Sequence, residues 1–183
     1  MVLSVTARDE WAASPMPAVV VRHALGEGLA REARARLERV GAGYTRYGLL
    51  DRGSYEEVSA PDEPELLDAL TGIAQEISGR SLVRVGARAL RLGPGDYVLL
   101  RHDRVYEDRP VELMLDLSPR AVSGAEVHYR HRGQVFFSFA SEPGALALVE
   151  RGPSVMCNHT YVSKRDPRAS LVRLVVLLAE RER

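Results

Sequence analysis

Two histidines stand where side chains of a β-barrel could meet at one metal ion. His102 follows the apolar run Tyr-Val-Leu-Leu-Arg, His159 follows Val-Met-Cys-Asn, and a polar stretch comes after each. If both runs are strands that end at the same mouth of a barrel, the two imidazoles converge there. Neutral imidazole binds iron, zinc and copper, so the ligand type alone does not choose the metal. From spacing alone, a structural role is the better interpretation of two histidines so far apart in the sequence.

The other three histidines give weaker indications of chemistry. His23 and His131 lie near the ends of predicted elements, where a surface or capping role is the simpler interpretation. His128 alternates with Glu126 and Arg130, which is typical of the solvated face of a strand. We therefore expect no site at these three positions.

The elements that would position these residues change in character near residue 80. Residues 18–22 predict a short strand, and residues 24–40 have alanine, leucine and arginine at helical spacing before glycines end the helix. Residues 44–58 are aromatic and predict an irregular, extended segment. A second helix is predicted over residues 61–77, with an apolar stripe formed by Leu66, Leu67, Leu70, Ile73 and Ile77.

Short β-rich runs separated by turn signals fill the rest of the chain. They cover residues 82–92, 97–102, 111–118, 126–130, 134–139, 145–150, 155–161 and 170–179. Many short strands at such spacing indicate a sandwich or a barrel. Two helices before an all-β half predict an α+β fold with the helices packed on one sheet. We expect one domain over residues 1–183, in which residues 18–80 support a β core over residues 81–183.

Composition limits the classes of function. The formal net charge is zero and apolar residues make up 45% of the chain, so we expect a globular protein without the basic field that attracts nucleic acid or an anionic membrane. Cys157 is the only cysteine, which excludes an intramolecular disulfide and fits a reducing cytosol. Residues 1–17 lack the apolar core of a signal peptide, and the longest apolar runs are too short to span a bilayer. The sequence thus predicts a cytoplasmic protein, and one lysine among many arginines hints at a high-GC bacterial genome.

From about Gly93 to the C-terminus, the chain resembles the prolyl-hydroxylase-type iron(II)/2-oxoglutarate dioxygenases, and the order of features carries this resemblance. GDYVLLRHD (95–103) resembles the strand that delivers the family's first histidine, and RPVELMLDLS (109–118) resembles the strand after it. VSGAEVHY (122–129) resembles the family's Ser-Gly-Gly turn and strand, and PGALALV (143–149) resembles the run before the second histidine. The resemblance implies a double-stranded β-helix, that is, a jelly-roll or cupin-like barrel with N-terminal supporting helices.

The resemblance also implies a cofactor and its ligands. His102 and His159 correspond to the family's two metal-binding histidines, which hold Fe(II) with one carboxylate and leave positions for 2-oxoglutarate and oxygen. Arg168 stands nine residues after His159, where the family has its 2-oxoglutarate-binding arginine, and a guanidinium fork suits the distal carboxylate of that cosubstrate.

The chain departs from the family at the metal motif. The family has His-x-Asp, whereas this chain has His102-Asp103-Arg104, so an arginine stands in the place of the ligating carboxylate. Residues i and i+2 of a strand point to the same side, so Asp103 would point away from the metal unless a bulge turns it inward.

A second departure lies in residues 111–118. Leucine and valine alternate with Glu112, Met114 and Asp116, a pattern that by itself predicts a polar face toward solvent. The resemblance instead turns these three side chains into the barrel lumen. Asp116 then stands where many relatives have a tyrosine that contacts 2-oxoglutarate, and two acids side by side are unfavourable unless one is protonated or a cation lies between them.

The first departure adds a positive side chain, Arg104, and the second adds two negative ones, Glu112 and Asp116, so these charges can balance one another in the lumen. Buried charges persist when they are paired, so we expect Arg104 to pair with Glu112 or Asp116. An alternative is that Glu112 replaces the missing metal carboxylate.

Three functions are compatible with these residues. The first is a non-haem iron(II)/2-oxoglutarate-dependent oxygenase that hydroxylates a small molecule or oxidises its C–H bond in a related way. The alternative is a repurposed or degenerate barrel of the same fold that binds metal or an anionic ligand without 2-oxoglutarate chemistry. The third is a structural or partner-binding domain without metal. The sequence identifies neither the substrate nor the oligomeric state.

Overall fold

The structure, a computed structural model of the chain, describes residues 5–39, 43–49, 53–100, 106 and 108–181. The first part consists of helix α1 (Val5–Ala13), strand β1 (Ala18–Val21), helix α2 (Glu27–Glu38), strands β2 (Thr45–Leu49) and β3 (Gly53–Ser59), and helix α3 (Pro64–Ser78). The strand-rich part consists of β4 (Leu82–Leu92), β5 (Tyr97–Val98), β6 (Val111–Asp116), β7 (Val127–His131), β8 (Gln134–Phe139), β9 (Leu146–Glu150), β10 (Val155–His159) and β11 (Leu171–Glu180).

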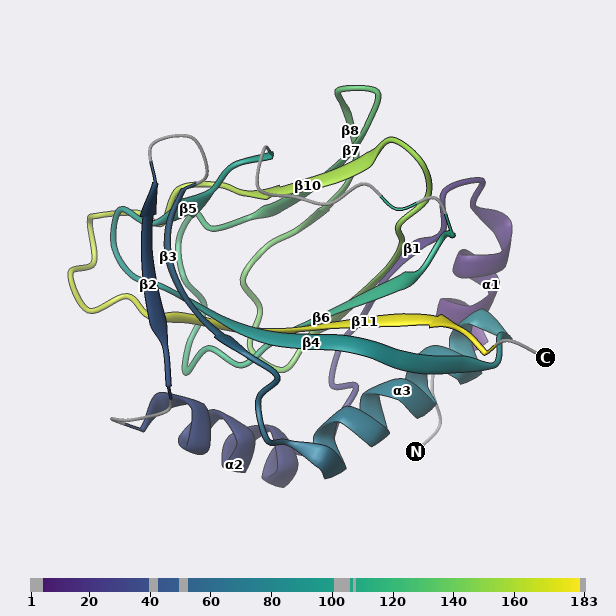
Figure 1. Cartoon of the computed structure of the whole chain (residues 1–183), viewed down its shortest axis with the longest axis horizontal. Coiled ribbons are helices and arrows are strands. Elements are labelled where there is room, and N and C mark those ends of the chain that lie inside the picture. Colours follow the sequence, from purple (N-terminus) through teal and green to yellow (C-terminus); the bar gives the residue numbers. More distant parts are fainter. Residues whose placement is uncertain (1–4, 40–42, 50–52, 101–105, 107, 182–183) are drawn as a thin grey trace.

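The strands form one antiparallel sheet that curls into two facing layers. The strand order is β1-β9-β6-β11-β4-β3-β5-β10-β7-β8, and β2 pairs with β3 outside this path. From β4 onward the chain alternates between a helix-side layer (β4, β6, β9, β11) and a far layer (β5, β7, β8, β10) (Figure 1). This alternation is that of a double-stranded β-helix, so the predicted fold is confirmed.

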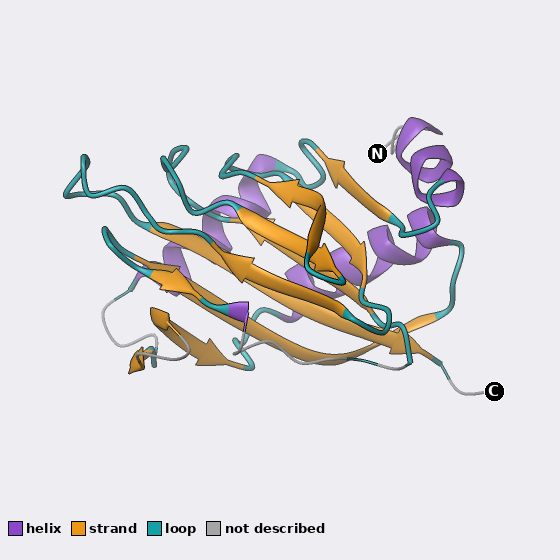
Figure 2. Cartoon of the chain, turned by 90° about the horizontal axis from the view of Figure 1, so that it is seen from above, coloured by secondary structure: helices purple, strands orange, loops and turns teal. Residues whose placement is uncertain are grey.

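The three helices cover the outer face of the helix-side layer (Figures 1 and 2). Helix α3 begins with Pro64 in its first turn and ends at Gly79, whose left-handed φ of 68° suits glycine. Its predicted apolar stripe is confirmed: all five of those side chains are buried, together with Ala74. They pack in one core cluster with Val111, Leu113 and Leu115 of β6 and with Leu117, which follows that strand.

The opposite face of the same strands lines the barrel interior, called the lumen below. Met114 and Val175 belong to this second apolar cluster, together with Val127, Tyr129 and Cys157 of the far layer. Strand β6 is buried along its whole length, so both of its faces are covered. Polar side chains on the lumen face of β6 are therefore removed from water, and each needs a partner inside the barrel.

The segment over residues 44–58 differs from the prediction of irregular structure, because it contains the paired strands β2 and β3. Strand β3 also pairs with β4 and β5, and so joins the two layers. Tyr47 and Tyr55 stack across the β2–β3 pair with ring centroids 5.2 Å apart. The strands were missed because pairing with distant strands, rather than local propensity, stabilises them. The first helix, α1, was not predicted either.

No helix in the described part of the chain is long and apolar enough to cross a membrane.

Candidate functional site

His159, at the end of β10, points into the lumen and is only 3% exposed. It pairs in register with Val98 of β5 on one side and Val127 of β7 on the other. Burial lowers the pKa of His159 well below 6.5, and the nearby positive charges of Arg173 and Arg88 lower it further. The imidazole is therefore neutral at pH 7.

Arg173, on β11, is the lumen residue that contacts this imidazole. Its Nη1 donates a hydrogen bond to Nδ1 of His159 at 3.2 Å, and its guanidinium carbon lies 5.4 Å from the centre of the Phe139 ring. The side chain is completely buried, and Nε and Nη2 have no partner among the described residues. Burial lowers the pKa of Arg173 to about 10, with Asp116 acting in the opposite direction, so the guanidinium stays charged at pH 7.

Asp116 lies directly opposite Arg173 in the β6–β11 pairing. Its carboxylate, however, accepts hydrogen bonds from other groups. It accepts hydrogen bonds from the backbone N–H groups of Ser118 and Glu142 at 2.8 and 2.9 Å and from the Ser141 hydroxyl at 2.9 Å. These bonds hold the turns beside β6. Asp116 thus supplies a negative charge near Arg173 without taking up its open N–H groups.

A second buried cluster is centred on Glu112. Its Oε1 accepts a hydrogen bond from the Tyr129 hydroxyl and its Oε2 accepts one from Nη1 of Arg151, both at 2.7 Å. Burial and the charge of Glu112 raise the pKa of Tyr129 well above 10, so the phenol remains a donor. The guanidinium of Arg151 also faces the rings of Tyr106 and Tyr129, at 5.2 and 5.8 Å. Sequence reasoning missed Tyr129 and Arg151.

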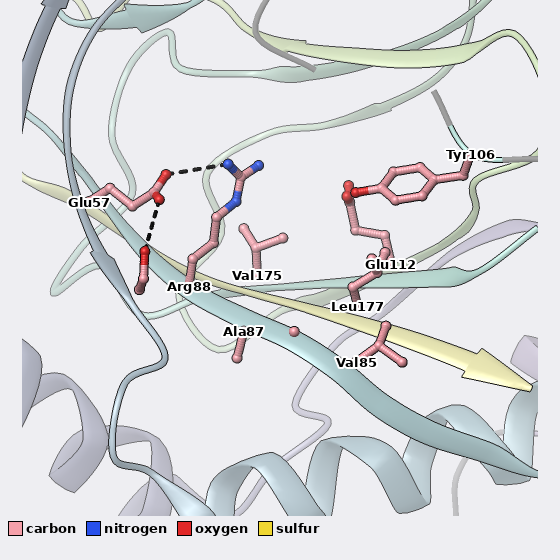
Figure 3. A pocket seen from close by; sticks show the side chains of 10 residues that line it. Glu57, Val85, Ala87, Arg88, Tyr106, Glu112, Val175 and Leu177 are labelled. Atoms are coloured by element: carbon pink, nitrogen blue, oxygen red, sulfur yellow. Dashed lines mark hydrogen bonds and ion pairs between the residues drawn. The ribbon is translucent and has the colours of Figure 1, made fainter. Parts of the chain in front are cut away.

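An open pocket of about 350 Å³ leads into the lumen next to these clusters. Figure 3 shows Glu57 and Arg88 pointing toward one another on one wall, and Glu112 with the ring of Tyr106 on the other. Nη1 of Arg88 lies 3.3 Å from Oε2 of Glu57. Val175, Leu177 and Val85 give the pocket an apolar surface between these walls.

The strand register places Arg173 beyond the inner end of this pocket. Along the lumen face of β11, Leu177 and Val175 line the pocket and Arg173 is the next residue that faces inward. Arg88 lies opposite Val175 on β4, and its charge acts on His159. One continuous strip of side chains thus runs from the pocket to Arg173 and His159.

Of the remaining residues predicted for the site, the structure describes Arg168 but not the residues of the metal motif. His102, Asp103 and Arg104 fall outside the described residues, and so does the predicted pairing of Arg104 with Glu112 or Asp116. Arg168 is exposed in the turn between β10 and β11, where its backbone N–H donates to Asp166. A single arginine within the run Leu-Val-Arg-Leu-Val-Val-Leu-Leu was the signal that could have identified Arg173.

Several solved structures have a fold similar to that of this chain. An oxidoreductase of the 2OG-Fe(II) oxygenase family from Burkholderia pseudomallei superposes with a TM-score of 0.72 over 97% of this chain and 91% of its own, at 11% identity. A Pseudomonas putida prolyl-4-hydroxylase gives 0.69 over 97% and 98%, at 16% identity. The chain has the fold of the 2OG-Fe(II) oxygenases. The alpha-ketoglutarate-dependent carbocyclase SnoK from nogalamycin biosynthesis also shares this oxygenase fold, with a TM-score of 0.70 over 98% and 85% and 14% identity.

No protein-family model and no curated protein sequence matches the chain. The resemblance inferred from the sequence is thus confirmed by structure, at the level of the fold.

The oxygenase fold implies an iron ion at His159, but the described side chains do not fit one. Because a guanidinium only donates hydrogen bonds, Nδ1 of His159 must be the acceptor, and the proton of the neutral ring then lies on Nε2. Neither nitrogen is then available to a metal. The positive charge of Arg173 opposes a divalent cation as well.

Proposed function

We propose that the protein is a repurposed barrel of the oxygenase fold that binds a small-molecule carboxylate in its lumen, with Arg173 as the anchor. The observation that carries this proposal is the pair of buried N–H groups of Arg173 that have no partner among the described residues. A buried donor without a partner costs about 1–3 kcal/mol, and more when it is charged. A carboxylate ligand would satisfy these donors, because a guanidinium fork matches its two oxygens.

The other lumen charges support the choice of Arg173. Arg151 is already paired with Glu112 and Arg88 with Glu57. Asp116 is held by two backbone N–H groups and a serine hydroxyl. Of the cationic side chains that the structure describes in the lumen, Arg173 is the one that combines full burial with an anion-binding surface that no carboxylate occupies.

Isothermal titration calorimetry with hexanoate, in buffer that contains a metal chelator, tests this proposal. We expect binding by the wild type and a loss of at least about tenfold in affinity for Arg173→Gln, since a charged hydrogen bond of roughly 1.5–3 kcal/mol is removed. Arg173→Lys should retain part of the binding because it keeps the charge. Arg168→Gln is the matched control in the exposed turn and should bind as the wild type does. Equal binding by Arg173→Gln, with its fold intact by circular dichroism, would contradict the proposal.

The second candidate is an iron(II)/2-oxoglutarate-dependent oxygenase that hydroxylates a small molecule or oxidises its C–H bond. The fold favours it, and so does the position of His159 in the lumen beside β5, since His102 follows β5 in the sequence. The similar structures include both a carbocyclase from nogalamycin biosynthesis and a prolyl-4-hydroxylase. This candidate requires Arg173 to release Nδ1 of His159.

Anaerobic addition of Fe(II) and 2-oxoglutarate distinguishes the two candidates. A weak visible charge-transfer band that is lost in His159→Gln would favour the oxygenase over the metal-free barrel. Carboxylate binding in the presence of chelator, without such a band after iron is added, is the result that we expect. In the oxygenase, Arg168→Gln would also weaken 2-oxoglutarate binding, as predicted from the sequence.

A further inference from the structure

We propose that the outer face of the far layer is a docking surface for an acidic, apolar peptide segment of another protein, with Arg130 and Leu99 as its anchors. This face lies outside the lumen, so the inference does not depend on the proposed function. It follows from two hollows on this face and from two arginines beside them.

The helices do not cover the outer face of the far layer. Helices α1, α2 and α3 lie on the other side of the molecule, against the helix-side layer (Figure 1). Strand alternation turns Tyr129 of β7 into the lumen and Arg130, the next residue, outward. In the same way Cys157 of β10 faces the lumen, and Met156 before it faces outward. Arg130 and Met156 are paired in register and so lie side by side on the outer face.

Two adjoining hollows of about 300 and 360 Å³ lie on this face, and both are open to solvent. We call them the outer hollows. Leu100 and Arg130 line both; Arg132, Gly133, Ser154 and Met156 complete one, and Leu99 and Asn158 the other. Their apolar surface comes from the two leucines and the methionine, and Leu99 is 37% exposed. Apolar side chains gathered at a hollow indicate an interaction site, and methionine adapts its shape to different partners.

Arg130 is held in place by uncharged groups. Its Nε donates a hydrogen bond to Oδ1 of Asn158 at 3.3 Å, and its Nη1 donates one to the carbonyl oxygen of Gly133 at 3.0 Å. Neither acceptor carries a charge, and no carboxylate of the described residues neutralises this guanidinium. The carboxylate of Glu126, on the same side of the molecule, is bonded to His128 instead. A guanidinium that is already fixed in position loses little conformational freedom when it binds an anion.

Arg132 adds a second positive charge at the edge of the same hollow. It lies in the two-residue turn of the β7–β8 hairpin, where its φ of 51° and that of 83° at Gly133 match a type I′ turn. Asn, Asp or Gly is usual at this position, so the arginine is not there for the sake of the turn. Within the described residues it pairs with no carboxylate, whereas the exposed Arg22 and Arg120 do.

The chemistry of the surface identifies the class of partner. A positive charge beside an apolar hollow is complementary to a carboxylate next to an apolar side chain, and a peptide with Asp or Glu beside Leu, Ile or Phe offers both. The outer hollows adjoin one another on an open sheet face, which suits an extended segment better than a small molecule that needs enclosure. A nucleic acid would satisfy the two arginines but would leave Leu99 and Met156 without apolar contacts.

Selection from a phage-displayed library of random peptides on the full wild-type chain tests the class of partner. We expect the enriched peptides to combine Asp or Glu with large apolar residues, and the best of them to bind in fluorescence anisotropy. A set of enriched peptides without acidic residues, or no enrichment at all, would overturn the inference. A fluorescein-labelled single-stranded oligonucleotide is the comparison. If it bound more tightly than the peptide and displaced it, the surface would be one for nucleic acid and the assignment to a peptide would be wrong.

Replacement of Arg130 tests the charged anchor with the best selected peptide. Arg130→Gln should weaken binding at least about tenfold, since a charged hydrogen bond to the peptide carboxylate is lost. Arg165→Gln is the matched control, because it removes the same charge from an exposed residue in the turn between β10 and β11. It should bind within about twofold of the wild type. Equal binding by Arg130→Gln and Arg165→Gln would overturn the role of Arg130.

Replacement of Leu99 tests the apolar anchor in the same assay. Leu99→Ser should weaken binding at least about fivefold, because apolar area that the peptide covers is removed. Tyr161→Ser is the control, since Tyr161 is 47% exposed and lies outside the outer hollows. Both variants should melt near the wild-type temperature by circular dichroism, because both side chains are on the surface. If Leu99→Ser bound as Tyr161→Ser does, the outer hollows would not be the docking surface.

Discussion

At the scale of single residues, the unusual feature is a guanidinium hydrogen-bonded to a buried histidine. Arg173 holds Nδ1 of His159 as an acceptor, and together with burial its charge keeps the ring neutral. In a metal site, the second ring nitrogen of a histidine commonly donates to a carboxylate or a carbonyl. A cation in that position reverses the polarity of the contact, which opposes a metal ion at His159. The anion is proposed because Nε and Nη2 of Arg173 have no partner among the described residues.

The depressed pKa of His159 predicts a loss of stability in acid. The unfolded chain binds the proton near pH 6.5 while the folded protein does so only at lower pH, so the stabilising contribution is complete above pH 6.5 and is lost as the pH falls below it. The slope is at most about 1.4 kcal/mol per pH unit. Urea unfolding at pH 7.5, 6.5 and 5.5 should show this decline in the wild type and a shallower one in His159→Gln.

The exposed His23 provides the control for this measurement. His23→Gln should retain the acid-induced decline of the wild type. If His159→Gln retained it too, the account of a neutral, buried His159 would be wrong.

At the scale of elements, β3 connects the two layers of the barrel. It pairs with β4 in the helix-side layer and with β5, which precedes the residues of the predicted metal motif. Gly53, at its start, has a φ of 137°, and a Cβ there would lie 2.3 Å from the carbonyl oxygen of Tyr97. Only glycine allows this approach of β3 to β5 without displacement of the backbone.

Gly53→Ala should therefore destabilise the junction between the layers. We expect a loss of roughly 2–5 kcal/mol, from the positive φ and from overpacking against Tyr97. Chemical denaturation measures the loss, and hydrogen exchange at Val98 should rise. Gly48→Ala on the adjacent strand β2, where a Cβ would meet nothing within 4 Å, is the control and should cost less than about 1 kcal/mol. A similar cost for both variants would contradict this role of Gly53.

At the scale of the whole molecule, the cluster of Glu112, Tyr129 and Arg151 ties the two layers together across the lumen. Glu112 lies on β6 of the helix-side layer, Tyr129 on β7 of the far layer, and Arg151 just after β9. The cluster is fully buried, and its hydrogen bonds cross the space that apolar side chains fill elsewhere. Breaking such a cluster on one side leaves a charge or a polar group buried without a partner.

Substitutions in this cluster should lower the free energy of unfolding by amounts that follow a defined order. Glu112→Gln removes the carboxylate that accepts the 2.7 Å hydrogen bond from Nη1 of the buried Arg151 and should cost about 3–5 kcal/mol. Tyr129→Phe removes one hydrogen bond and should cost about 1–3 kcal/mol. Glu142→Gln, which removes an exposed pair with Arg22, is the control and should cost less than about 1 kcal/mol. Urea denaturation curves at pH 7.5 would show the order, and a smaller cost for Glu112→Gln than for Tyr129→Phe would contradict it.

The sequence by itself determined helix α3 and most of the strands, and it showed which side chains of α3 and β6 share a face. The 3.6-residue spacing of leucine and isoleucine in α3 and the two-residue alternation in β6 are local patterns, and each reports which side chains share a face. The strand-forming runs predicted a sandwich or barrel, and the resemblance of the chain from Gly93 onward to the prolyl-hydroxylase-type dioxygenases predicted the oxygenase fold.

Only the tertiary structure decided which charges meet. Within the described residues, Glu112 binds Arg151 and His159 binds Arg173, and the sequence had identified neither arginine as a partner. These contacts depend on the register of strands far apart in the chain, and a shift of one residue would turn each side chain to the opposite face. Arg168 and Arg173 lie five positions apart in the sequence, yet the fold leaves one in an exposed turn and buries the other beside His159.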